Sequence, residues 1–219
     1  MPTTEEHTQK TIAFVLYPGL TVLDLTGPLQ VLTALSEIAP EYRTVVVAER
    51  VEPTDTDIPG EMKVIPNNTF EEVPHPFAFV VPGGVTPTLR TMSNEAIRNY
   101  VRSAAETAEV VSSVCTGALV LGSVGLLDGR QATTHWAFYK VLEQFGAKYV
   151  RKRWVEDGKF ICSAGVSAGS TWRYSWRPGS PMNRRPGRCS TGLATIPSLH
   201  LAGSTTSISV ANSVYGEPG

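Results

Sequence analysis

A cysteine between a β-branched segment and a small-residue segment is the residue of this chain best suited to nucleophilic chemistry. Residues 110–114 (VVSSV) are typical of a buried strand, and residues 116–122 (TGALVLG) favour a helix that starts directly after Cys115. A sharp strand-to-helix turn exposes the side chain at the turn and points it at the first amides of the helix. A thiol placed there is expected to lose its proton more readily than a free cysteine, and the thiolate is the nucleophile. The other interpretation of Cys115 is a small buried apolar residue.

Four further residues could work with such a thiol. Asp24 follows the apolar segment 11–17, and the pair Gly83-Gly84 follows the apolar segment 77–81. A carboxyl group can serve as a general acid or base, and paired glycines let backbone amides approach a reacting atom. The alternatives are a helix cap for Asp24 and a tight turn for the glycines. Thr116 lies beside the thiol whether it caps the helix or contacts a substrate.

The elements that must position these residues alternate along the chain. Buried strands are predicted at residues 11–17, 44–48, 77–81 and 110–114, and helices at 29–39, after Pro28, at 94–108 and from Cys115 to about 125. This alternation predicts an α/β fold in which helices cover both faces of a mostly parallel sheet. Ligands of such folds bind beyond the carboxyl ends of the strands, where the candidate residues follow.

The composition excludes several classes of function. The chain has 219 residues, a formal net charge of −1 and three cysteines. This charge balance predicts no nucleic-acid or membrane partner, and the cysteine spacing matches neither a disulfide framework nor a metal cluster. Residues 1–10 are polar, and no apolar segment approaches the ~18 residues of a membrane span. A cytoplasmic location is therefore expected.

Five motifs together resemble a known family: LDLTGP at 23–28, PGG at 82–84, SVCTGALVLG at 113–122, ATTHW at 132–136 and SAGVSAG at 163–169. They are similar to the ThiJ/PfpI branch of the class I glutamine-amidotransferase-like superfamily, and within it to isonitrile hydratases. The resemblance implies a flavodoxin-like three-layer sandwich, usually homodimeric, and a cofactor-independent hydratase. Its small-molecule substrate would be an isonitrile, and its product an N-substituted formamide.

The resemblance also implies roles for particular residues. Cys115 matches the nucleophile, Asp24 the pocket carboxylate, and Thr116 the threonine beside the nucleophile. Gly83 and Gly84 match a loop whose backbone N–H groups face the cysteine. No cofactor and no metal are implied. Relatives with peptidase or glyoxalase-like activity commonly carry histidine after the cysteine, so Thr116 disfavours a Cys-His mechanism.

The sequence leaves a second function open, and it also leaves two interpretations of His135. The same motifs occur in sensor domains of AraC-type regulators, where the pocket would bind a ligand or sense oxidation without turnover. His135 is interpreted as a hydrogen-bonded structural residue rather than a base.

The resemblance ends at Gly169. The remaining segment contains five Arg, no Lys and a single acidic residue, Glu217, and it has no sustained periodicity. We therefore predict three regions: a polar tail at 1–10, a ThiJ/PfpI-like domain at 11–169, and an irregular tail at 170–219. An out-of-frame segment would explain the abrupt change, and a neighbouring reading frame without a helix-coding continuation would contradict that hypothesis.

Overall fold

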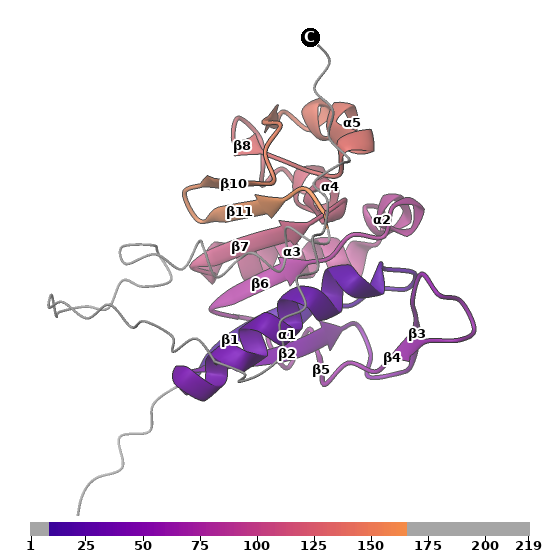
Figure 1. Cartoon of the computed structure of the whole chain (residues 1–219), viewed down its shortest axis with the longest axis vertical. Helices are drawn as coiled ribbons and strands as arrows, with labels where there is room; N and C mark the ends of the chain where they lie inside the picture. The colour runs from indigo at the N-terminus through magenta and orange to yellow at the C-terminus, as the bar shows by residue number, and fades with distance from the viewer. Residues whose placement is uncertain (1–8, 166–219) are drawn as a thin grey trace, which may run out of the picture. The chain divides into compact units, whose positions relative to one another are not determined.

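The computed structural model describes residues 9–165, and strands and helices alternate along this part of the chain (Figure 1). The predicted regions 1–10 and 170–219 lie almost wholly outside it. The elements are β1 (Lys10–Val15), α1 (Val22–Ile38), β2 (Tyr42–Ala48), β3 (Thr54–Asp55), β4 (Lys63–Val64), β5 (Asn68–Thr69), β6 (Ala78–Val81), α2 (Thr86–Thr91), α3 (Glu95–Thr107), β7 (Val110–Val114), α4 (Gly117–Ser123), β8 (Gln131–Ala132), the 3₁₀ turn η1 (Trp136–Phe138), α5 (Tyr139–Gln144), β9 (Lys148–Tyr149), β10 (Trp154–Asp157) and β11 (Phe160–Ser163).

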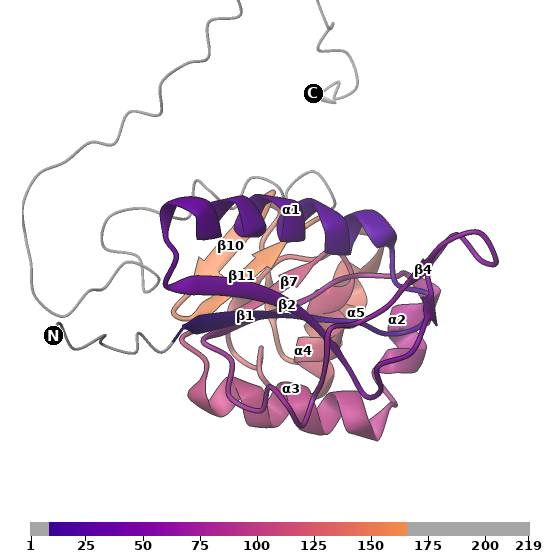
Figure 2. The same cartoon turned by 90° about the horizontal axis from the view of Figure 1, so that it is seen from below.

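A seven-stranded sheet forms the centre of the domain. Its order is β10-β11-β7-β6-β1-β2-β5, and every neighbouring pair is parallel except β10 and β11. Helix α1 lies on one face, and α2, α3 and α4 lie on the other (Figure 2). Strands β6 and β7 are buried along their whole length, as expected where both faces are covered. The predicted three-layer α/β fold is confirmed.

Helix α1 begins earlier than predicted. It starts at Val22, so Pro28 lies inside the helix and Asp24 in its first turn. Proline has no N–H to donate to the carbonyl four residues earlier, which here is the carbonyl of Asp24. The first turn forms nevertheless, because Asp57 Oδ1 accepts a hydrogen bond from the Val22 amide at 3.0 Å. A cap supplied from a distant segment thus outweighs the local proline signal.

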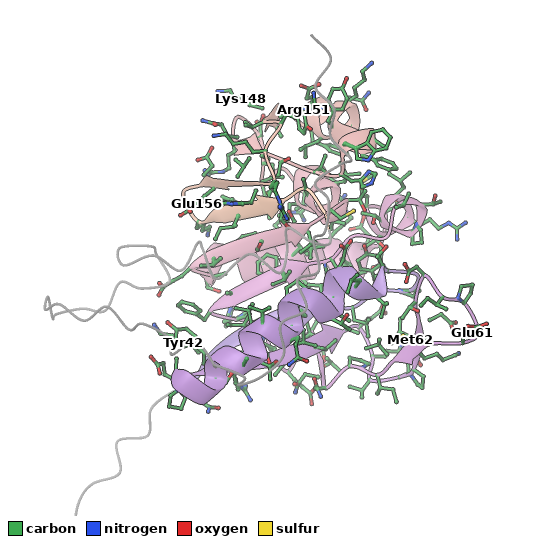
Figure 3. The ribbon with its side chains drawn as sticks, viewed as in Figure 1. Tyr42, Glu61, Met62, Lys148, Arg151 and Glu156 are labelled. Carbon is green, nitrogen blue, oxygen red and sulfur yellow. The ribbon has the colours of Figure 1, made fainter. Side chains whose placement is uncertain are left out.

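The segment that supplies this cap includes the short antiparallel pair β3–β4. Figure 3 shows Glu61 at the outer edge of this segment and Met62 next to its short strands. Thr56 forms an isolated bridge with Leu20, and the Asp57 amide donates to the Leu20 carbonyl at 2.9 Å. The segment therefore contacts the chain between β1 and α1, immediately before Asp24.

The strand order places the candidate residues together. Strands β1, β6 and β7 are neighbours in the sheet, and their carboxyl ends lead into Tyr17, Pro82 and Cys115 respectively. Because parallel strands end at the same edge, the loops that carry Asp24, Gly83 and Cys115 converge there.

Candidate active site

Cys115 occupies a strained turn between β7 and α4. Its φ is +56°, a left-handed conformation that is uncommon for a residue other than glycine. The turn is held on both sides: the Cys115 amide donates to the Ser163 carbonyl at 2.9 Å, and the Thr134 hydroxyl donates to the Cys115 carbonyl at 2.9 Å. Such backbone strain costs on the order of 1–3 kcal/mol and is characteristic of functional sites. The predicted strand-to-helix turn is therefore present.

Gly117 allows this turn to pack against β6. A Cβ atom added there would lie 2.0 Å from the Val81 carbonyl oxygen. Because the obstacle is backbone, we expect Gly117→Ala to lower the free energy of unfolding by about 3 kcal/mol or more. Gly27→Ala is the matched control, since a Cβ added at that helical glycine meets nothing within 4 Å. We expect it to be neutral or to stabilise by about 0.5–1 kcal/mol. Urea unfolding measures both, and equal effects would contradict the packing argument.

Gly83 brings the three side chains of the candidate site into contact. A Cβ added at Gly83 would lie 2.7 Å from Asp24 Oδ2, 2.8 Å from Cys115 Cβ and 2.8 Å from the Thr116 nitrogen. No side chain fits between these groups, so glycine is required at this position. The sequence-predicted residues Asp24, Gly83, Cys115 and Thr116 thus meet at one point.

Asp24 is fully buried, and it lacks a regular hydrogen-bond partner. Among the described residues, neither carboxylate oxygen has a partner with standard geometry. The Cys115 thiol and the Gly83 amide still favour its charged form, while burial, the largest influence, raises its pKa to about 6. The negative charge of Asp57 raises this pKa further. A buried carboxyl whose pKa lies near neutrality is suited to proton transfer.

Asp24 should also make the folded protein less stable as the pH rises. Its pKa is about 6, against an ordinary 3.8, so between these values the folded state holds a proton that the unfolded state has released. The free energy of unfolding therefore falls by roughly 3 kcal/mol as the pH rises through this window. Urea unfolding of the wild type and Asp24→Asn at a series of pH values isolates this carboxyl. Parallel stability curves for the two proteins would contradict its raised pKa.

The prediction that the Cys115 thiol ionises more readily than a free cysteine is wrong. Burial raises the pKa of the Cys115 thiol to about 12, and the negative charge of Asp24 raises it further. The backbone amide of Thr116 lowers this pKa by less than those two effects raise it. The resting site therefore holds a protonated thiol beside a carboxyl group that is mostly ionised at neutral pH.

Thr116 is fully engaged in hydrogen bonds. Its Oγ1 accepts from the amides of Gly84 at 3.0 Å and Val85 at 3.1 Å, and it shares a hydrogen with Thr88 Oγ1 at 2.8 Å. The resemblance implied that the Gly84 amide faces the cysteine, but that amide is bound to the Thr116 hydroxyl instead. Gly83 remains as the loop residue that directly contacts Cys115 and Asp24.

Sequence reasoning missed three residues around the site: Tyr17, Asp57 and Thr88. Tyr17 is buried and donates to the Pro82 carbonyl at 2.8 Å, and it contacts Thr88 Oγ1 at 3.0 Å. The only signal in the sequence is the position of Tyr17 at the end of the predicted apolar strand, two residues beyond the end of β1. The contacts of Asp57 and Thr88 depend on tertiary structure alone.

The other candidates lie apart from this chemistry. His135 Nδ1 accepts from the Ala137 amide at 3.3 Å and caps η1, as its structural interpretation predicts. Cys162 is buried in β11. Within residues 9–165, no group of three His, Cys, Asp or Glu could hold a metal ion. No helix in the same part of the chain is long and apolar enough to cross a membrane.

A parallel α/β sandwich with a cysteine on a strained turn beside a buried carboxylate defines a class of proteins. Residues 10–175 match the DJ-1/PfpI family, and the chain belongs to it. The chain is 41% identical over 160 residues to the isonitrile hydratase of Pseudomonas putida; the match covers 72% of this chain and 66% of that protein. The predicted family is therefore confirmed.

Two further relatives add detail. The crystal structure of a ThiJ/PfpI family protein from Pseudomonas syringae superposes with a TM-score of 0.72 at 30% identity, covering 82% of this chain and 75% of that chain. The HTH-type transcriptional regulator CdhR of Pseudomonas aeruginosa is 29% identical over 158 residues, which are 71% of this chain and 46% of the regulator. The chain thus spans just under two thirds of the hydratase and under half of the regulator.

Proposed function

We propose that this chain hydrates an isonitrile to an N-substituted formamide, with Cys115 as nucleophile and Asp24 as proton carrier. The observation that carries the proposal is the meeting of the thiol with a buried carboxylate at Gly83. Similarity to the Pseudomonas putida isonitrile hydratase supports the reaction class.

In the first half-reaction, the proton of the thiol moves through Asp24 to the substrate. The terminal carbon of an isonitrile carries a lone pair, and it becomes electrophilic once it is protonated. Asp24 takes the proton from Cys115 Sγ and gives it to that carbon, and the sulfur then bonds to the same carbon. The product is a thioimidate, S–CH=N–R, and the Asp24 carboxylate is regenerated. The thiolate forms only as its proton passes to Asp24, so the route does not require an ionised thiol in the resting site, where the pKa of Cys115 is raised.

In the second half-reaction, Asp24 activates water. Water adds its oxygen to the thioimidate carbon, and the nitrogen gains a proton. The carbon–sulfur bond then breaks, the hydroxyl proton returns to the sulfur through Asp24, and the formamide leaves. Gly83 and the Thr116 amide, which faces the sulfur, hold these groups in place.

Formation of formamide from a simple aryl isonitrile tests the proposal. The purified chain is incubated with the isonitrile, and the product is identified by mass spectrometry against an authentic formamide. Turnover above the rate in buffer is the expected result. A folded chain that produces no formamide would refute the proposal.

A second candidate is a sensor domain without turnover, which the similarity to the regulator CdhR favours. A redox sensor requires a thiolate, and a thiol with a pKa of about 12 reacts slowly with peroxide at neutral pH. A ligand sensor would bind an isonitrile or another small molecule and release it unchanged. Intact mass after mild peroxide treatment, compared with formamide production, separates the two functions.

A further inference from the structure

Three buried hydroxyls form a hydrogen-bond chain that ends beside the nucleophile. Thr116 Oγ1 contacts Thr88 Oγ1 at 2.8 Å, and Thr88 Oγ1 contacts the Tyr17 hydroxyl at 3.0 Å. The Tyr17 hydroxyl in turn donates to the Pro82 carbonyl at 2.8 Å. Tyr17, Thr88 and Thr116 are all almost completely excluded from solvent. Because bulk water is excluded, each hydroxyl hydrogen in this hydrogen-bond chain has to be donated to an atom of the protein.

The direction of the chain follows from counting donors and acceptors. A hydroxyl has one hydrogen and two lone pairs. Both lone pairs of Thr116 Oγ1 are used by the amides of Gly84 and Val85, so Thr116 must donate its hydrogen to Thr88. Thr88 must then donate to Tyr17, because the single hydrogen of Tyr17 goes to Pro82. Burial raises the pKa of the Tyr17 phenol above its ordinary value, so this donor stays protonated.

We propose that Tyr17 and Thr88 are positioning residues that turn the Thr116 proton away from the Cys115 sulfur. With that hydroxyl committed to Thr88, the group among residues 9–165 that is left to exchange a proton with the thiol is Asp24. The same chain fastens the loop after β6 at both ends, through Pro82 at one side and Gly84 with Val85 at the other. It thereby keeps Gly83 against Cys115 and Asp24. The direction of the chain stands on these hydrogen bonds alone, and its consequence for turnover rests on the proposed function.

Removing a member of the chain should release the Thr116 proton toward the sulfur. In Tyr17→Phe, Thr88 loses the acceptor of its hydrogen. Its hydroxyl can then rotate toward Thr116, where its hydrogen would compete with the Thr116 hydrogen for the position between the two oxygens. In Thr88→Val, Thr116 loses its acceptor directly. A hydroxyl that donates to the sulfur stabilises the thiolate. We therefore expect both variants to lower the pKa of Cys115. The titratable groups that already act on this thiol are Asp24 from α1 and Tyr17 after β1, and Asp57 acts on Asp24.

The test is a titration of the Cys115 thiolate by its ultraviolet absorbance, with the signal of the matching Cys115→Ala protein subtracted. This readout needs no substrate and does not depend on access of a reagent. We expect Tyr17→Phe and Thr88→Val to lower the apparent pKa by about one unit or more, a tenfold change in ionisation. Thr88→Ser keeps the hydroxyl and should titrate like the wild type.

Tyr100→Phe is the matched control for loss of a buried tyrosine hydroxyl. Tyr100 donates to the Val73 carbonyl at 3.1 Å, and no hydrogen bond connects it to Thr88 or Thr116 in the part of the chain described. It should leave the Cys115 titration unchanged. Wild-type titration in both Tyr17→Phe and Thr88→Val would overturn the proposal, as would an equal shift in Tyr100→Phe. Should Tyr17→Phe fail to fold, Thr88→Val against Thr88→Ser carries the same test. Formamide production, measured separately, reports on the proposed function.

Discussion

Replacing Cys115 with alanine is expected to lower the hydration rate of an aryl isonitrile by at least about 10³-fold, because the carbon–sulfur bond of the thioimidate can no longer form. The fold should survive, since the side chain becomes smaller and the backbone bonds from Cys115 to Ser163 and Thr134 do not involve the sulfur. Initial rates of formamide formation, measured beside far-ultraviolet circular dichroism, check both expectations.

Cys162→Ala is the matched control for this substitution. Cys162 is also a buried free cysteine, but it pairs with Ser113 inside the sheet rather than standing on the turn. We expect its hydration rate to stay within about threefold of the wild type, with a modest loss of stability typical of a shortened core side chain. Wild-type turnover in Cys115→Ala would exclude the covalent mechanism.

Asp24→Asn is expected to change two measured rates in opposite directions. The amide cannot carry the proton from sulfur to substrate, so hydration should fall by roughly 10²–10⁴-fold. The same change removes the negative charge that raises the pKa of Cys115. Alkylation of Cys115 by iodoacetamide at neutral pH should therefore become faster.

Asp57→Asn provides the comparison for Asp24→Asn. Asparagine at position 57 can still accept the hydrogen bond from Val22, but it removes a charge that raises the pKa of Asp24. We expect a small downward shift of that pKa and nearly unchanged hydration. If Asp24→Asn slowed alkylation and hydration together, a general collapse of the site would explain the data better than a lost proton carrier.

The turn at Cys115 could be predicted because its cause is local. A β-branched segment that meets a small-residue segment at Cys115 leaves little choice of structure, and Gly117 permits the close contact with Val81. The parallel sheet was predictable for the same reason, since buried strands in such sheets are apolar along their whole length.

The start of α1 and the ionisation of Cys115 could not be predicted, because both depend on distant residues. Pro28 indicates a helix start, and only the cap from Asp57 shows why the helix begins about two turns earlier. An exposed turn beside helical amides favours a thiolate, but burial and the charge of Asp24 reverse that expectation. The hydrogen-bond chain of Tyr17, Thr88 and Thr116 joins the loop after β1, helix α2 and the start of α4, and no spacing within the sequence indicates it.

The proposed mechanism depends most on a covalent bond between Cys115 and the substrate carbon. A single-turnover experiment, with protein in excess over an aryl isonitrile and rapid quenching, tests it most directly. We expect the peptide that contains Cys115 to gain the full mass of the isonitrile and to lose it again as the formamide appears. The mechanism would be contradicted if formamide appeared while Cys115 stayed unmodified at every time point. In that case Cys115 would also react with iodoacetamide as fast as it does without the isonitrile.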